Sequence, residues 1–112
     1  MEDDLVAWGR VIRIETHGRV TGREAVAVVG YVERPDGALW VATGSPDADW
    51  GLNLLAEPAC RVTLGDAPPF TAIARPLERD EHRAAVRELI LRYGTPAESL
   101  GAGPSFELRP TA

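Results

Sequence analysis

The sequence predicts one mainly β domain, an antiparallel β-barrel of six or so strands with two helices. Apolar residues alternate with a period of two along much of the chain, and Gly, Pro and Asp residues separate the apolar segments. The expected order is three strands, a short helix, two strands, a longer helix and a last strand. This order is not a β-α-β pattern, and consecutive hairpins favour a closed or partly closed barrel, which removes exposed edge strands. Residues 1–112 are expected to form a single domain.

The N-terminal half predicts three strands. Residues 11–17 alternate as a half-buried strand does, and the glycine-bracketed residues 18–22 form a turn that leads out of it. Residues 24–33, which are rich in valine, and residues 38–43 predict two further strands. Pro, Asp and Gly within residues 34–37 suit a tight turn between them.

A short helix is expected next, and then the C-terminal elements. Ser45 as N-cap, with Pro46 at the first helical position and two aspartates in the first turn, begins the short helix, which Pro58 ends. Asp80 can cap a longer helix that closes at Gly94. One face of that helix is apolar and carries Val86, Leu89, Ile90 and Tyr93. The remaining strands are predicted at residues 59–64, 70–77 and 106–109.

Composition limits the function classes. The formal net charge of -5 argues against general nucleic-acid binding, which needs a basic surface to neutralise phosphates. No stretch approaches the roughly 20 apolar residues that cross a bilayer, and the acidic start, residues 1–4, differs from a basic secretory signal. We therefore expect a cytoplasmic protein with no membrane span. A chain of this size leaves much surface exposed, so we also expect a homodimer.

The usual catalytic motifs are absent from the sequence. There is no P-loop, no Cys-x-x-Cys and no Gly-x-Ser-x-Gly segment. The two histidines, His17 and His82, are too few for a His-rich metal site, and His82 is expected to be a plain surface residue. Cys60 lies in a predicted strand and is expected to be a buried, inert thiol. No metal site and no catalytic residue is assigned.

The turn after the first strand is a candidate anion site. Its glycines leave backbone N–H groups unobstructed, and its threonines and arginines add further donors for phosphate oxygens. The candidate cofactor-binding residues here are Thr16, Gly18, Arg19, Thr21, Gly22 and Arg23. The alternative interpretation is that the arginines are solvated strand and turn residues.

A second candidate segment is the start of the short helix. The residues Ala42, Thr43, Gly44 and Ser45 could offer N–H groups to an anion, although Asp47 and Asp49 would repel a phosphate unless they point away. The alternative role of Ser45 is that of a helix cap. On the helix itself, Asn53 could bind a cofactor or tie down a neighbouring strand, and Trp50 could line a ring pocket or fill the core.

Several spaced motifs resemble one known family. They are Thr-His-Gly-Arg-Val-Thr-Gly-Arg at 16–23, Gly-Tyr at 30–31, Leu-Trp-Val-Ala-Thr-Gly at 39–44 and Trp-Gly-Leu-Asn-Leu-Leu-Ala-Glu-Pro at 50–58. In this order they resemble the deazaflavin-dependent nitroreductase and quinone reductase family. The resemblance implies an FMN-binding split β-barrel, commonly dimeric, that binds coenzyme F-420. Such a protein passes hydride from the reduced cofactor to a quinone, enone or nitro compound.

The resemblance also implies residue roles. Arg19 and Arg23 would face the acidic tail of the cofactor, residues 42–44 its phosphate, and Trp50 and Asn53 its cleft. The sequence departs from the family pattern at Ala25, where a further arginine is common, and in the short segment before Trp50. Tyr93 is the sole candidate proton donor, with plain packing as the alternative. Two other interpretations stay open: an FMN- or haem-binding relative, and a non-catalytic dimeric barrel without a cofactor pocket.

Overall fold

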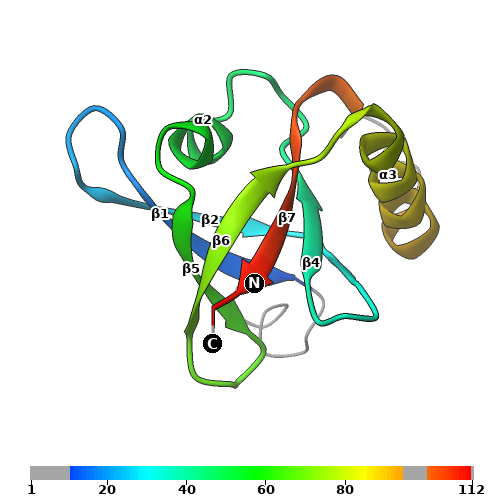
Figure 1. Cartoon of the computed structure of the whole chain (residues 1–112), viewed down its shortest axis with the longest axis horizontal. Coiled ribbons are helices and arrows are strands. Elements are labelled where there is room, and N and C mark those ends of the chain that lie inside the picture. The colour runs from blue at the N-terminus through cyan, green and yellow to red at the C-terminus, as the bar shows by residue number, and fades with distance from the viewer. Residues whose placement is uncertain (1–10, 95–100, 112) are drawn as a thin grey trace.

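The computed structural model describes residues 11–94 and 101–111, in which seven strands and two helices form one curled half-barrel (Figure 1). The mainly β architecture with two helices is therefore confirmed. The strands are β1 (Ile12–His17), β2 (Glu24–Val29), β3 (Val32–Glu33), β4 (Leu39–Ala42), β5 (Ala59–Leu64), β6 (Phe70–Pro76) and β7 (Ser105–Pro110). The helices are α2 (Asp49–Ala56) and α3 (Arg79–Tyr93). The acidic residues 1–4 lie outside the described residues.

All strand pairs are antiparallel, in the order β2-β1-β5-β6-β7-β4-β3. The expected hairpin between the first two strands is confirmed, with Ile12 opposite Val29 and His17 opposite Glu24. Alternation places one face of β1 inside the curl, so that Ile12 and Ile14 are completely buried, whereas all four residues of β4 are buried. These side chains form the core with residues of the other strands. In Figure 1, α2 lies over one end of the curl, and α3 flanks the sheet beside β4.

The strand predicted at residues 24–33 is interrupted, and this part of the prediction was wrong. The ring of Tyr93 lies so close to Gly30 that a Cβ there would stand 2.9 Å from it. The Tyr93 hydroxyl accepts a hydrogen bond from the Tyr31 N–H at 3.0 Å and donates one to the Tyr31 carbonyl at 3.3 Å. Because a side chain satisfies these backbone groups, the segment separates into β2 and β3.

Both predicted helix starts were also wrong. The helix α2 begins at Asp49 with Ala48 as N-cap, and Ser45 Oγ instead accepts a hydrogen bond from the Asp47 N–H at 3.2 Å within a turn. The helix α3 begins earlier than expected. Glu78, not Asp80, is its N-cap and forms a capping box with Glu81.

The single cysteine lies in the barrel wall. Cys60 is buried in β5, and its Sγ lies 3.6 Å from the Ala72 carbonyl oxygen. Burial raises the pKa of the Cys60 thiol to about 11, because the thiolate loses its hydration there. The expectation that this thiol is buried is thus confirmed.

Candidate functional site

The turn between β1 and β2 projects from the sheet on the side of α2 (Figure 1). The Gly18 N–H donates to the Arg23 carbonyl and the Gly22 N–H donates to the Gly18 carbonyl, each at 2.9 Å. These two N–H groups are therefore engaged within the turn and do not face a ligand. Gly22 has φ of +77° and a Cβ on Gly18 would collide with the Arg23 carbonyl oxygen, so both positions require glycine.

Asn53 fixes this turn to α2. Its side chain is buried, and its Nδ2 donates to Thr16 Oγ1 at 3.0 Å. Its Oδ1 accepts two hydrogen bonds from Arg19, from the backbone N–H at 3.2 Å and from Nη1 at 2.8 Å. One amide thus joins the end of β1, the turn and the helix. Of the two roles considered for Asn53, the contacts support that of a structural tie.

Arg19 also contacts Asp49, which lies one helical turn before Asn53 in α2. Its Nη2 lies 3.3 Å from Asp49 Oδ1, and its Nη1 donates to the Asp49 carbonyl at 3.4 Å. Asp49 and Asn53 are four residues apart and so share one helix face. That spacing is visible in the sequence and could have indicated that both residues reach the same partner. The sequence analysis expected Asp49 to repel a phosphate unless it points away, and it did not predict the contact with Arg19.

A pocket of about 260 Å³ opens between the turn and α2. Its walls carry two arginines, one buried amide and two carboxylates, and Ala25 leaves room where a longer side chain would fill it. The lining residues are Gly18, Arg19, Val20, Thr21, Arg23, Glu24, Ala25, Asp49 and Asn53. The guanidinium groups suit a carboxylate or phosphate ligand. The volume is below the roughly 300 to 1,000 Å³ of complete small-molecule sites.

The other candidate residues lie outside this pocket. Thr16 is 1% exposed, and its hydroxyl lies between Asn53 and the Ala25 carbonyl. Trp50 packs against the core, with its ring centroid 6.3 Å from that of Phe106. Gly22 lies in the turn itself but does not line the pocket.

The segment Ala42–Ser45 is also held by protein contacts. Ala42 is buried at the end of β4. Thr43 Oγ1 lies 3.0 Å from both the Ser45 and the Pro104 carbonyl oxygens, and its N–H donates to Pro104 at 3.0 Å. The hydroxyl that a phosphate would use is therefore engaged. Gly44, with φ of +75°, provides the sharp change of direction between β4 and the turn that follows.

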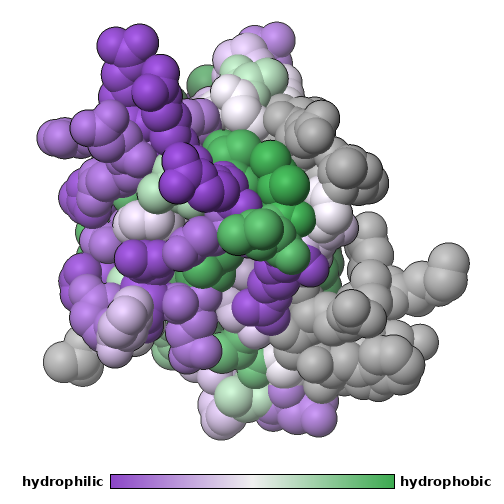
Figure 2. Space-filling model, turned by 90° about the vertical axis from the view of Figure 1, so that its right-hand side faces the viewer, coloured by the Kyte–Doolittle hydropathy of each residue, from purple (hydrophilic) through white to green (hydrophobic). Residues whose placement is uncertain are grey.

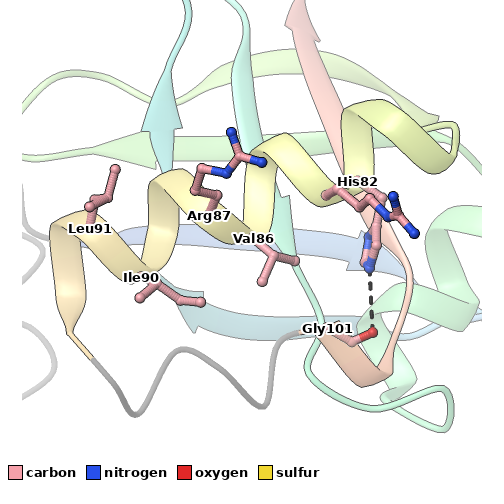
Figure 3. Close-up of a pocket in the computed structure, with 7 residues that line it drawn as sticks. His82, Val86, Arg87, Ile90, Leu91 and Gly101 are labelled. Atoms are coloured by element: carbon pink, nitrogen blue, oxygen red, sulfur yellow. Dashed lines mark hydrogen bonds between the residues drawn. The ribbon is translucent and has the colours of Figure 1, made fainter.

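An apolar cavity of about 510 Å³ lies on α3, away from the turn (Figures 2 and 3). Val86, Ile90 and Leu91 form its apolar part. His82 also lines it, and the expectation that His82 is a plain surface residue was wrong. Its Nδ1 lies 2.7 Å from Ser105 Oγ and its Nε2 lies 3.4 Å from the Gly101 carbonyl oxygen, so it joins α3 to β7.

The family model of F420H(2)-dependent quinone reductase matches residues 6–97, which is most of the chain. The chain belongs to this family. The family is one of quinone reductases that depend on reduced F-420, and its cofactor is therefore F-420. Among residues 11–94 and 101–111, no cluster of three or more His, Cys, Asp or Glu side chains could hold a metal ion. No match was found among curated proteins.

Solved structures agree with this family in fold. An F420-H2 dependent reductase is 23% identical with a TM-score of 0.74, and the alignment covers 89% of this chain and 94% of that one. The haem storage protein HutZ from Vibrio cholerae is 20% identical with a TM-score of 0.76, covering 97% and 87%. A haem-binding protein from Mycobacterium smegmatis is 18% identical with a TM-score of 0.70, covering 98% and 50%. At these identities the similarity shows the fold alone, a split β-barrel.

Neither α2 nor α3 is long and apolar enough to span a bilayer.

Proposed function

We propose that this chain is an F-420-dependent oxidoreductase that reduces an electron-poor small molecule, namely a quinone, an enone or a nitro compound. The pocket between the turn and α2 carries this proposal, because it presents Arg19 and Arg23 together at a site of limited volume. Bound reduced F-420 supplies the hydride. The residues of the chain bind and orient the cofactor and the substrate, as in other enzymes whose cofactor carries out the chemistry.

Arg19 and Arg23 have different tasks in this proposal. Asn53 holds Arg19 in one direction through a hydrogen bond of 2.8 Å, so Arg19 meets the anionic tail with little loss of side-chain freedom. Arg23 is exposed on the outer part of the turn and adds a second positive charge. Thr21 Oγ1 accepts a hydrogen bond from the Arg23 N–H at 3.3 Å and so supports that position.

A second copy of the chain is proposed to complete the site. The pocket of about 260 Å³ is too small for the ring system, which needs a further wall. The strand β2 is at one edge of the described sheet, and its Val26 side chain is 58% exposed. An edge strand with an exposed valine is a surface that pairing with another copy would cover. We propose a homodimer, and we place it in the cytoplasm.

Titration of the purified protein with F-420 and, separately, with FMN tests the function. We expect quenching of tryptophan fluorescence by F-420 that weakens with added salt, because the tail is bound through arginines. FMN binding that is tighter than F-420 binding would move the assignment to a flavoprotein. Absence of binding by either compound would favour a barrel without a cofactor.

Alanine variants test the residues. Changing both Arg19 and Arg23 to alanine should weaken F-420 binding by about 2 to 4 kcal/mol, from roughly 1 to 2 for each charge-assisted contact. Arg23→Ala alone tests tail binding more directly, because a change at Arg19 also removes a hydrogen bond to Asn53. Arg83→Ala on α3 removes the same charge away from the pocket and should leave the affinity unchanged. Equal affinities for Arg23→Ala and Arg83→Ala would contradict the assigned tail site.

A further inference from the structure

The Arg19 guanidinium has two side-chain partners on α2 that differ in burial and charge. Nη1 donates to Asn53 Oδ1 at 2.8 Å, and Nη2 lies 3.3 Å from Asp49 Oδ1. Asn53 is 2% exposed and neutral, whereas the Asp49 side chain is 83% exposed and carries a negative charge. An incoming ligand can therefore displace Asp49 without disturbing the buried bond to Asn53.

We propose that Asp49 is a built-in competitor for the anionic group of the ligand at Arg19, and that it thereby sets the affinity of the pocket for that ligand. This inference rests on the proposed function, since it concerns the same pocket. Asp49 occupies the Nη2 end of the guanidinium that a ligand carboxylate or phosphate would take. Asp49 also lines the pocket, so its carboxylate stays near the ligand after the ligand has displaced it from Arg19.

Asp49 weakens binding of the anionic ligand through two physical effects. The ligand must first break an ion pair, which is weak because it is exposed to water and has a single contact. The released carboxylate then repels the negative ligand across a short distance. Asn53 keeps Arg19 pointing into the pocket throughout, so removal of Asp49 should not disorder the arginine.

The segment before α2 offers a matched control. Asp47 lies two residues from Asp49, and its N–H bonds to Ser45 Oγ at 3.2 Å. Within residues 11–94 and 101–111, it makes no ion pair with Arg19. Asp47→Asn therefore removes the same charge from the same segment without removing the competitor.

The test measures F-420 affinity of the wild type, Asp49→Asn and Asp47→Asn. Asp49→Asn should bind about 1.5- to 5-fold more tightly than the wild type, the range expected for one exposed ion pair, and the gain should shrink at high salt. Asp47→Asn should gain less. In an Arg19→Ala background, Asp49→Asn should show only the smaller gain of the Asp47 variant. Equal affinities of the two asparagine variants, or no gain for Asp49→Asn, would overturn the role of Asp49.

A second probe separates this inference from the proposed function. If the wild type does not bind F-420, the proposed function is wrong, and the same variants are titrated with inorganic pyrophosphate. Tighter pyrophosphate binding by Asp49→Asn than by Asp47→Asn supports Asp49 as the competitor for anions. Equal binding, or no binding by either variant, overturns it.

Discussion

Asn53 Oδ1 accepts hydrogen bonds from both the backbone N–H and the guanidinium of Arg19, at 3.2 and 2.8 Å. The same side chain donates to Thr16 Oγ1 at 3.0 Å. A single buried amide thus sets the position of the turn and the direction of its arginine. The proposed anion site therefore depends on a residue that need not touch the ligand.

Asn53→Ala should therefore lower both stability and affinity. The variant loses three hydrogen bonds and leaves the Thr16 hydroxyl with one partner fewer, which should cost about 1 to 3 kcal/mol of unfolding free energy. Thermal unfolding and F-420 titration measure the two effects. Thr16→Val is the matched control, because it removes the bond to Nδ2 and leaves both bonds to Arg19. It should lower stability alone, and an equal loss of affinity would contradict the role of Asn53 in orienting Arg19.

Gly103→Ala should destabilise the chain by about 1 to 3 kcal/mol, because overpacking forces its neighbours to move. A Cβ there would collide with Thr43 Oγ1 and stand 2.5 Å from the Ser45 backbone nitrogen. Gly101→Ala is the control, since a Cβ there meets nothing within 4 Å and should change stability by less than about 0.5 kcal/mol. Urea unfolding of the two variants distinguishes them. Similar midpoints would show that the contact at Thr43 is readily relieved.

Tyr93→Phe should lower the unfolding free energy by about 1 to 2 kcal/mol. The phenylalanine ring still packs on Gly30, but the Tyr31 N–H loses its acceptor at 3.0 Å. Because the hydroxyl is engaged by the Tyr31 backbone, we do not expect it to donate a proton to a substrate. The folded variant should reduce the small-molecule electron acceptor at the same rate and with the same pH profile as the wild type. A selective loss of rate at unchanged cofactor affinity would restore Tyr93 as a proton donor.

Glu81→Gln should reduce the acid sensitivity of the protein. Hydrogen bonds from Arg75 and from the Glu78 N–H lower the pKa of Glu81 from 4.5 to about 2. The folded state thus binds this proton less readily than the unfolded state, and the stabilisation present above pH 4.5 is lost as the pH falls towards 2. Glutamine keeps the capping box but has no ionisable carboxyl group. The midpoint of thermal unfolding of the Glu81→Gln variant should therefore vary less over this pH range.

Asp80→Asn is the matched control for the Glu81 change. It removes one negative charge from the same helical turn and should keep the acid dependence of the wild type. Thermal unfolding between pH 2 and pH 5 compares the three proteins. If Glu81→Gln and Asp80→Asn changed the pH dependence equally, the contacts of Glu81 would not be its source.

Much of the fold follows from local pattern. Alternating side chains decide which face of β1 is buried, and β5 has the predicted bounds. The family motifs indicated the cofactor class, and the glycines of the turn marked the place where the chain reverses. These features were predictable because each depends on neighbouring residues.

The candidate site was predicted less completely. Gly18, Arg19, Thr21, Arg23 and Asn53 line one pocket, and their role in cofactor binding stays a prediction. Thr43 and Trp50, which carried the same expectation, are engaged by Pro104 and Phe106. Those contacts join residues more than fifty positions apart, and no local pattern encodes them.

Local sequence pattern was enough to predict the antiparallel strands, the glycine turn, the burial of Cys60 and the family to which the chain belongs. Long-range contacts established that Tyr93 interrupts a valine-rich strand, that His82 joins α3 to β7, and that the Asp49 carboxylate pairs with Arg19. The difference lies in the range of the interactions. Side-chain periodicity and turn preference act between neighbours, whereas a hydrogen bond between a side chain and a distant backbone group exists only once the sheet has curled and brought the two together.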